Sequence, residues 1–339
     1  MSRRRLRVGL VGAGLIARRA HLPAFSASSG AEVVAVASGR LASAQTAAEE
    51  FSIPRAYETW QELIDDPDID AVDICALNSL HAPIAIAAAH AGKHVLVEKP
   101  MAVSVEEADA MVAAADRAGV VLMVAHNLRF VPVFEKLHEL IGNGSLGPIQ
   151  TARGVFMHAG PDESWGATSD WFWREETAGG GALLDLGIHM IDLLRWVIGR
   201  PARQVSAMVS RLAKPTFAED NAIVLVRFEG DVLASIQASW TARPFPDNQV
   251  TIQCEEGRVI VGRSSTEPIT VYRGTGDGVE KQTPEVAANS KHGDLFQHFV
   301  KVVSEGTRPL IDGRDGRDSL ALALAAYESA KSGRLAVPK

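Results

Sequence analysis

Short apolar runs alternate with Ala-rich amphipathic segments between Leu6 and Ala125. The runs contain many Val, Ile and Leu residues and few polar positions, which is typical of strands buried on both faces of a parallel sheet. The predicted strands are Arg7–Val11, Glu32–Ala37, Ala71–Leu77, His94–Glu98 and Val120–Ala125. The predicted helices between them are Ala20–Ser28, Ala42–Phe51, Ala82–Ala91 and Val105–Ala118. Because each strand is followed by a crossover helix, we predict an α/β domain with a doubly wound parallel sheet over residues 1–125.

After Phe130 the pattern changes to a helix at Val133–Ile141 and then to a long series of alternating, strand-like segments. The predicted strands are Gln150–Met157, Arg203–Ser210, Ala222–Phe228, Val232–Ser239, Val250–Cys254 and Arg258–Val261. The predicted helices are Ala182–Val197 within this series and Gly293–Glu305 and Gly316–Ser332 after it. This pattern predicts a second, α+β domain over residues 126–339 with a largely antiparallel open sheet.

Composition and charge narrow the range of partners. With 47% hydrophobic and 22% charged residues in 339, the chain has the composition of a folded protein of two domains. The net charge of -7 disfavours nucleic-acid binding, and no apolar run reaches the roughly 18 residues of a membrane span. Two cysteines, Cys75 and Cys254, are too few for a disulfide framework, and no signal-peptide cleavage site follows the first apolar run. We therefore expect a cytoplasmic protein with neither a membrane nor a nucleic acid as partner.

A glycine motif directly follows the first predicted strand. The segment Gly12-Ala13-Gly14-Leu15-Ile16-Ala17 matches G-x-G-x-x-G/A at a strand-to-helix junction. Gly12 permits a tight turn, Gly14 admits a diphosphate close to the backbone, and Ala17 is small enough for close packing of helix on strand. The amides of Leu15 and Ile16 would then face the anion at the helix N-terminus. An ordinary Gly-rich turn is the alternative, but the position favours a Rossmann dinucleotide site.

The end of the second predicted strand bears on the choice of cofactor. NAD-binding domains of this kind carry an acidic residue there, which binds the ribose 2′-hydroxyl. This chain has Ser38-Gly39-Arg40 instead. A hydroxyl and a guanidinium suit a 2′-phosphate, so the segment favours NADP over NAD, with Arg40 as a solvated loop residue the alternative.

Lys99 ends the fourth apolar strand, in Glu98-Lys99-Pro100. Ligands of open parallel sheets bind at the carboxyl ends of the strands, so Lys99 is expected to face the cofactor crevice. Pro100 favours an extended Lys99 and stiffens the turn. A solvated charged loop is the alternative.

A second polar pair follows three glycines, Gly179 to Gly181. Asp185 and His189 are four residues apart on the predicted helix and therefore share one face. The pair is also compatible with a buried histidine and a capping acid. A zinc site would need further ligands at suitable spacing, which the sequence lacks, so we expect no metal.

Together, Gly12–Ala17, Glu98-Lys99-Pro100 and the triple glycine with Asp185 and His189 resemble the Gfo/Idh/MocA family of NAD(P)-dependent oxidoreductases over essentially the whole chain. The resemblance implies hydride transfer between a hydroxyl-bearing carbon of a sugar, cyclitol or related polyol and a nicotinamide. It implies that His189 transfers the hydroxyl proton, that Lys99 stabilises the developing alkoxide, and that Asp185 orients His189 or the substrate. This requires Lys99 and His189 to meet beside the nicotinamide.

The resemblance also implies further cofactor contacts. Glu98 is expected to position the cofactor or Lys99 rather than to transfer protons. Additional candidates match family segments near the cofactor or the entry to the second domain: Asn78, His81, Asn127, Trp173 and Arg174.

Three questions stay open at this level. Tightly held NAD could instead drive elimination or glycoside cleavage by transient oxidation, and a non-catalytic redox sensor could use the same fold. The aromatic segment His158–Glu176 is either a pocket wall or part of the core or an interface. Because a sheet with one uncovered face is often buried by a second subunit, we expect a homodimer or homotetramer.

Overall fold

The computed structural model describes residues 4–262, 267–291 and 293–339, and these form two compact units. The first unit consists of residues 4–126 and 293–317, and the second takes the described residues of 127–291 and 318–339. The predicted C-terminal domain included residues 293–317, which here belong to the first unit. Phe296 packs edge-on against Phe25 with ring centroids 5.3 Å apart, and Arg317 forms an ion pair with Asp109 at 2.8 Å. The apolar pattern of a helix does not reveal which partner covers it, so this return to the first unit could not be predicted from the pattern.

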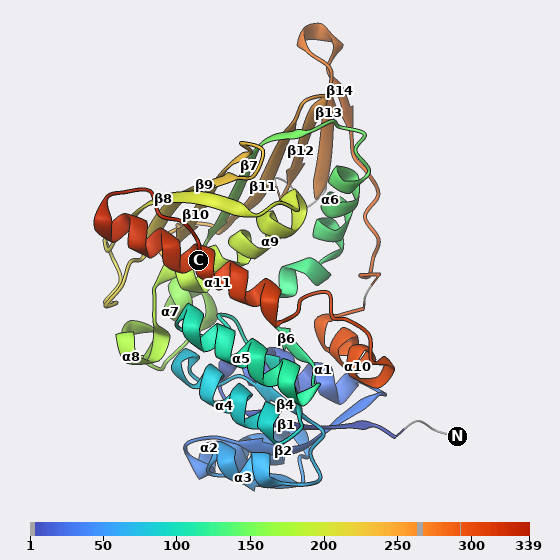
Figure 1. Cartoon of the computed structure of the whole chain (residues 1–339), viewed down its shortest axis with the longest axis vertical. Helices are drawn as coiled ribbons and strands as arrows, with labels where there is room; N and C mark the ends of the chain where they lie inside the picture. Colours follow the sequence, from blue (N-terminus) through green and yellow to red (C-terminus); the bar gives the residue numbers. More distant parts are fainter. Residues whose placement is uncertain (1–3, 263–266, 292) are drawn as a thin grey trace. The chain divides into compact units, whose positions relative to one another are not determined.

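Six parallel strands form the sheet of the first unit, in the order β3-β2-β1-β4-β5-β6 (Figure 1). Their bounds are β1 Leu6–Val11, β2 Ala31–Ala37, β3 Arg55–Tyr57, β4 Ala71–Ile74, β5 His94–Val97 and β6 Leu122–Val124. The predicted doubly wound parallel sheet is confirmed. Only β3 was missed, because its three half-buried residues are too few for a visible pattern.

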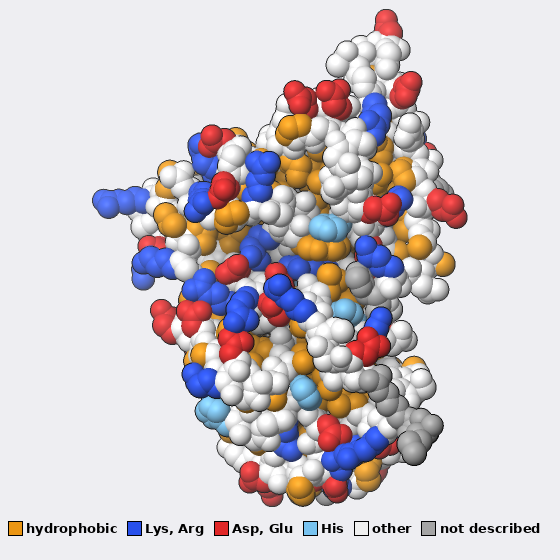
Figure 2. Space-filling view, turned by 45° about the vertical axis from the view of Figure 1, so that its right-hand side comes forward, with side chains coloured by type: hydrophobic (Ala, Val, Ile, Leu, Met, Phe, Trp, Pro, Cys, Tyr) orange, Lys and Arg blue, Asp and Glu red, His pale blue; other side chains and the backbone are white. Residues whose placement is uncertain are grey.

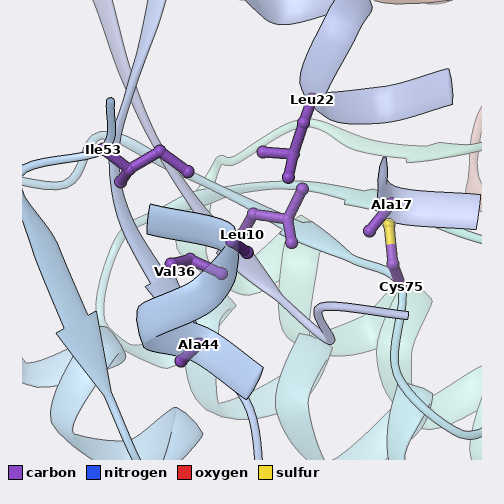
Figure 3. Close-up of a cluster of buried hydrophobic side chains, with 8 residues drawn as sticks. Leu10, Ala17, Leu22, Val36, Ala44, Ile53 and Cys75 are labelled. Atoms are coloured by element: carbon purple, nitrogen blue, oxygen red, sulfur yellow. The ribbon is translucent and has the colours of Figure 1, made fainter. Parts of the chain in front are cut away.

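Helices cover both faces of this sheet. Their bounds are α1 Leu22–Ala27, α2 Leu41–Phe51, α3 Trp60–Asp65, α4 Asn78–His90, α5 Val105–Ala118 and α10 Leu295–Glu305. A cluster of buried apolar residues joins α1 and α2 to β1 and β2 through Leu22, Ala44, Leu10 and Val36 (Figure 3). On the other face, α3 approaches Gly9 with the side chains of Leu63 and Ile69 nearby, and α4 packs against α5.

Eight strands form the sheet of the second unit, in the order β14-β13-β12-β11-β7-β10-β9-β8. Their bounds are β7 Ile149–Met157, β8 Ala202–Ser210, β9 Asn221–Phe228, β10 Leu233–Ser239, β11 Asp247–Cys254, β12 Gly257–Val261, β13 Ile269–Arg273 and β14 Glu280–Gln282. Neighbouring strands are antiparallel except β7 and β10, which run parallel. The predicted largely antiparallel sheet is therefore confirmed, with β13 and β14 as strands that the pattern did not reveal.

Helices line one face of the second sheet. The helices of this unit are α6 Pro132–Gly142, α7 Gly160–Trp165, α8 Glu175–Ala178, α9 Ile188–Ile198 and the part of α11 Gly313–Ser332 that follows residue 317. α9 packs on β7 and α6 packs on α9. On the opposite face large apolar side chains are exposed, including Met208 at 82% and Leu225 at 55% of their accessible area. This sheet therefore has one covered and one open face.

The described surface mixes charges of both signs. Basic and acidic side chains are interspersed over the face shown in Figure 2. Among the described residues, no helix has the length and apolar character needed to cross a membrane. Both cysteines, Cys75 and Cys254, are buried and free.

Candidate active site

The turn after β1 has the geometry that its glycines require. Gly12 has a φ of +100°, and a Cβ there would lie 2.4 Å from the carbonyl oxygen of Cys75. A Cβ at Gly14 would meet nothing within 4 Å, so the chain leaves open space at that point. Leu15 and Ile16 are partly exposed, whereas Ala17 is fully buried. The turn thus presents exposed backbone at the start of a helix, as a diphosphate-binding turn does.

A π turn, Ala17–His21, follows the glycine motif and leads into α1. The N–H of Leu22 donates to the carbonyl of Ala17, five residues earlier, rather than to the residue four earlier as in an α-helix. The predicted helix Ala20–Ser28 is therefore only partly regular. The π turn leaves His21 buried against the sheet, with 1% exposure.

Ser38 and Arg40 follow β2 as predicted from the sequence. Ser38 is half-buried and Arg40 is exposed. Arg40 precedes α2, and its carbonyl accepts the backbone N–H of Ser43. Within the described ranges no hydrogen bond or ion pair of the Arg40 guanidinium is found, so this cation is available to a ligand.

Lys99 follows β5, and its backbone is fixed by the residue before it. The N–H of Lys99 donates to Glu98 Oε2 at 3.0 Å. The other carboxylate oxygen, Glu98 Oε1, lies 2.9 Å from His21 Nε2. Burial opposes ionisation of Glu98, but the hydrogen bond and charge of His21 outweigh it and hold the pKa of Glu98 below its usual value. Glu98 is thereby kept as a carboxylate beside Lys99.

A buried polar group that was not predicted from the sequence lies behind Glu98. His21 Nδ1 lies 2.8 Å from Asp73 Oδ2 and 3.2 Å from Cys75 Sγ. Burial raises the pKa of the Cys75 thiol to about 12. One atom each of His21, Asp73 and Cys75 lie within 4.8 Å of one another, an arrangement that a metal ion could use. This arrangement was not predicted, because His21 is more than 50 residues from Asp73 and Cys75 in the chain.

Asn78 and His81 both lie in the first turn of α4, directly after β4. The ring of His81 is buried between two backbone carbonyls, with Nδ1 2.8 Å from Pro100 O and Nε2 3.1 Å from Ala76 O. Burial lowers the pKa of His81. His81 therefore links α4 to the residues that follow Lys99, and its contact with a cofactor stays a prediction.

In the second unit, Asp185 and His189 lie where a π turn, Leu183–Gly187, passes into α9. The predicted helix Ala182–Val197 is thus present, but it begins with a wider turn than an α-helix has. Trp240 Nε1 donates to Asp185 Oδ2 at 3.0 Å. The ring of His189 lies 5.4 Å from the ring of Phe156, and 8% of the residue is exposed. Aromatic side chains therefore hold both members of the pair.

Glu219 caps this helix and was not found from the sequence. Its carbonyl accepts the N–H of Ala182 at 3.0 Å, and its Oε1 accepts the N–H of Leu183 at 2.8 Å. The hydroxyl of Tyr327 also donates to Oε1, at 2.8 Å. Burial raises the pKa of Glu219 despite these donors. A Cβ at Gly181 would lie 1.9 Å from the Glu219 carbonyl oxygen, which explains the glycine that precedes the helix.

The predicted aromatic segment, His158–Glu176, packs beside Trp240, the residue whose indole contacts Asp185. Trp173 lies in a 3-10 turn, Trp171–Trp173, and packs edge-on against Trp240 with centroids 5.7 Å apart. Arg174 is exposed and forms an ion pair with Asp170. Asn127 is exposed at the start of the second unit. Whether Asn127, Trp173 and Arg174 contact a cofactor stays a prediction.

The open face of the second sheet carries a hollow of about 600 Å³. Its described lining includes Arg153, Leu225, Leu233 and Arg258. Asp185 and His189 are not among these lining residues, because they belong to the helices of the other face. This hollow is therefore not where the predicted catalytic pair acts.

Comparisons with known families match both units. The family described as "Oxidoreductase family, NAD-binding Rossmann fold" matches residues 6–126. The "GFO/IDH/MocA C-terminal domain" matches residues 134–260.

Individual proteins match over nearly the whole chain. A 1,5-anhydro-D-fructose reductase of Ensifer adhaerens is 34% identical, over 97% of this chain and 98% of its own length. A myo-inositol 2-dehydrogenase of Thermotoga maritima is 28% identical, over 97% of each chain. Among solved structures, levoglucosan dehydrogenase in complex with NADH and L-sorbose superposes with a TM-score of 0.87 at 27% identity, covering 99% of this chain and 100% of its own.

Proposed function

This chain belongs to the GFO/IDH/MocA family of oxidoreductases, and we propose that it transfers hydride between a nicotinamide cofactor and a hydroxyl-bearing carbon of a sugar, cyclitol or related polyol. The observation that carries the proposal is the turn after β1, where Gly12 cannot be replaced without a clash and Gly14 faces open space. The sugar and cyclitol relatives support this substrate class.

The residues around this turn fit a dinucleotide. The backbone from Gly12 to Ile16 would hold the diphosphate, and Ser38 and Arg40 after β2 would hold the adenosine ribose. When bound, the nicotinamide accepts or donates the hydride. The further contacts proposed for the cofactor are Asn78, His81, Glu98, Asn127, Trp173 and Arg174.

In the proposed mechanism His189 accepts the hydroxyl proton of the substrate during oxidation and returns it during reduction, as an imidazole can near neutral pH. The Lys99 ammonium donates to the same oxygen and stabilises the negative charge that develops on it. Asp185 orients His189 or the substrate, and the indole of Trp240 fixes the Asp185 carboxylate.

The roles of Lys99 and His189 are tested by Lys99→Ala and His189→Ala. We expect each substitution to lower kcat by about 100- to 1000-fold, because each removes a group that acts on the reacting oxygen. Binding of the cofactor, measured by fluorescence titration, should stay close to that of the wild type. A screen of polyols and sugars with NAD and NADP, followed by nicotinamide absorbance, supplies the substrate for these assays. Normal turnover in either variant would contradict the proposal.

The same absorbance assay separates the alternative chemistry. A dehydrogenase reduces one nicotinamide for each substrate oxidised, whereas elimination through transient oxidation turns over without net reduction. The relatives named as reductase and dehydrogenases favour the first.

We further propose NADP as the preferred cofactor, since Arg40 is exposed without a partner among the described residues and no acid follows β2. The family model names NAD, and a solved relative holds NADH, so the preference rests on Ser38 and Arg40 alone. Arg40→Ala should weaken NADP binding by about 10-fold or more and NAD binding much less, because a guanidinium contributes about 1.5–3 kcal/mol to a charged hydrogen bond. Dissociation constants from titration measure this, and equal losses for both cofactors would remove the reason for the preference.

We also propose that a second copy covers the open face of the second sheet, giving a homodimer or homotetramer. The exposed apolar side chains on β8, β9 and β10 support this, since such a patch is seldom left in water. A cytoplasmic location likewise stays a prediction from composition.

A further inference from the structure

The proposed chemistry leaves His21 without a function. This residue is 1% exposed and lies between two carboxylates of the first unit. Its Nδ1 is 2.8 Å from Asp73 Oδ2, and its Nε2 is 2.9 Å from Glu98 Oε1. Burying three ionisable groups together is costly, so the network calls for a functional explanation.

We propose that His21 is a positioning residue for Lys99, which joins the buried carboxylate of Asp73 to Glu98 and so fixes the carboxylate that accepts the Lys99 N–H. The proposal rests on the role proposed above for Lys99. The chain of contacts is continuous: Asp73 to His21, His21 to Glu98 at 2.9 Å, and Glu98 to the Lys99 backbone at 3.0 Å.

Rigid elements hold each member of the network. Asp73 lies within β4, where it pairs with Leu96 of β5, and Glu98 follows two residues later. The π turn places His21 against these strands. The ring of Phe296 packs edge-on against the imidazole with centroids 4.7 Å apart. The geometry of Glu98 therefore depends on the sheet and not on a flexible loop.

The protonation of His21 follows from this geometry. The titratable groups that face the ring are Asp73 in β4, Cys75 directly after β4, and Glu98 directly after β5. Lys99 lies beyond Glu98. Both ring nitrogens face a carboxylate oxygen, so the ring donates on both sides only as an imidazolium. Burial opposes this, but the charge of Asp73 outweighs it and raises the pKa of His21 well above its usual value.

Asp73 depends on His21 in turn. Its Oδ1 is buried without a hydrogen-bond partner among the described residues, and its Oδ2 accepts from His21. The same oxygen lies 3.9 Å from Cys75 Sγ, so the imidazole of His21 is its nearest polar neighbour. A metal ion held by His21, Asp73 and Cys75 would need Nδ1 without its proton, so bound metal and the imidazolium exclude each other at this place.

The first test observes His21 directly, in the full chain without cofactor. With ¹⁵N-labelled histidine, NMR should show that one of the ten imidazoles keeps both nitrogens protonated at pH values where an ordinary histidine, with a pKa of about 6.5, has lost its proton, and this signal should be missing from His21→Gln. In Glu98→Gln, which keeps the side-chain size, the same ring should lose its proton at lower pH than in the wild type. A His21 ring that titrates near its ordinary pKa in the wild-type protein, or stoichiometric zinc in the purified protein, would overturn the proposal.

The second test measures turnover. His21→Gln should lower kcat by about 10- to 100-fold with little change in KM, because it displaces a catalytic group without removing it. In a Lys99→Ala background the same substitution should have no further effect, since His21 acts through Lys99. An unchanged kcat in His21→Gln, or an equal loss in both backgrounds, would refute the positioning role.

His94→Gln is the matched control. His94 stands at the opposite end of β5, where its Nδ1 accepts the N–H of Val121 at 3.1 Å, and its loss should leave kcat near the wild-type value. If Lys99→Ala itself turns over normally, the proposed function fails while the NMR result on His21 still stands, so the two failures are distinguishable. If His21→Gln does not fold, the Glu98→Gln titration decides the question.

Discussion

The two units hold their candidate catalytic side chains in different ways. In the first unit the backbone N–H of Lys99 is held by the carboxylate of Glu98, and His21 lies between Glu98 and Asp73 at hydrogen-bond distances. In the second unit Asp185 is held by the N–H of an indole, and His189 packs against the ring of Phe156.

The two kinds of support differ in how strongly they respond to the loss of one charge or one contact. A buried ionic network loses much of its stability when one charge is removed, because the remaining charges have no solvent to replace the partner. An aromatic wall has no charge to lose, and each contact contributes only about 0.5–1.5 kcal/mol. We therefore expect the first unit to respond more strongly to single substitutions and to pH.

Breaking the ionic network should give the larger effect. Asp73→Asn should lower the free energy of unfolding by about 3–5 kcal/mol, as expected when one member of a buried ion pair is removed. The loss should be fully present below about pH 6.5 and should shrink as the pH rises towards the raised folded-state pKa of His21, because the unfolded imidazole loses its proton in this range and the proton held in the folded wild type then stabilises the fold less and less. Urea titrations at about pH 6 and about pH 9 measure this difference.

Asp192→Asn is the control for that experiment. Asp192 is 1% exposed and accepts from Arg129 at 2.7 and 2.9 Å, but a guanidinium does not titrate in this range. The control should therefore be destabilised without the pH dependence. A flat pH profile for Asp73→Asn would show that His21 is neutral in the folded protein.

Breaking the aromatic support should give the smaller effect. Trp240→Phe removes the N–H that donates to Asp185 and keeps a ring against Trp173, so kcat should fall about 3- to 10-fold, as for one hydrogen bond. Steady-state kinetics with the best substrate measure the fall, and cofactor affinity should not change. Trp196→Phe, a substitution in a tryptophan that stacks on His138, controls for the loss of an indole in the same unit. If both variants turn over alike, the indole does not orient Asp185.

Much of the fold could be predicted from the sequence, because apolar periodicity directly reflects which faces are buried. The helix Val105–Ala118 was predicted with the bounds that the structure shows, since Ser104 caps it and Gly119 ends it in the left-handed region. Short elements such as β3 and β14, with three residues each, were not found because their residues are half-buried or exposed and show no alternation of apolar and polar positions.

The candidate site was predictable only where its residues belong to a local motif. Gly12, Lys99, Asp185 and His189 stand beside glycines or a proline that mark their positions. His21, Asp73 and Glu219 have no such markers, and their significance comes from contacts between segments distant in the chain, such as the 2.8 Å bond from Leu183 N to Glu219. Side-chain networks of that kind depend on tertiary packing, which periodicity does not encode.

Because residues 293–317 return to the first unit, a truncation of the chain after residue 126 removes part of that unit. A fragment ending at residue 126 would lack α10, and Phe25, Gly30 and His21 would lose the neighbours that Phe296 and Val300 provide. The nucleotide-binding half is thus a discontinuous module, completed by a stretch of chain synthesised after most of the other unit, and no single cut between consecutive residues can excise it intact.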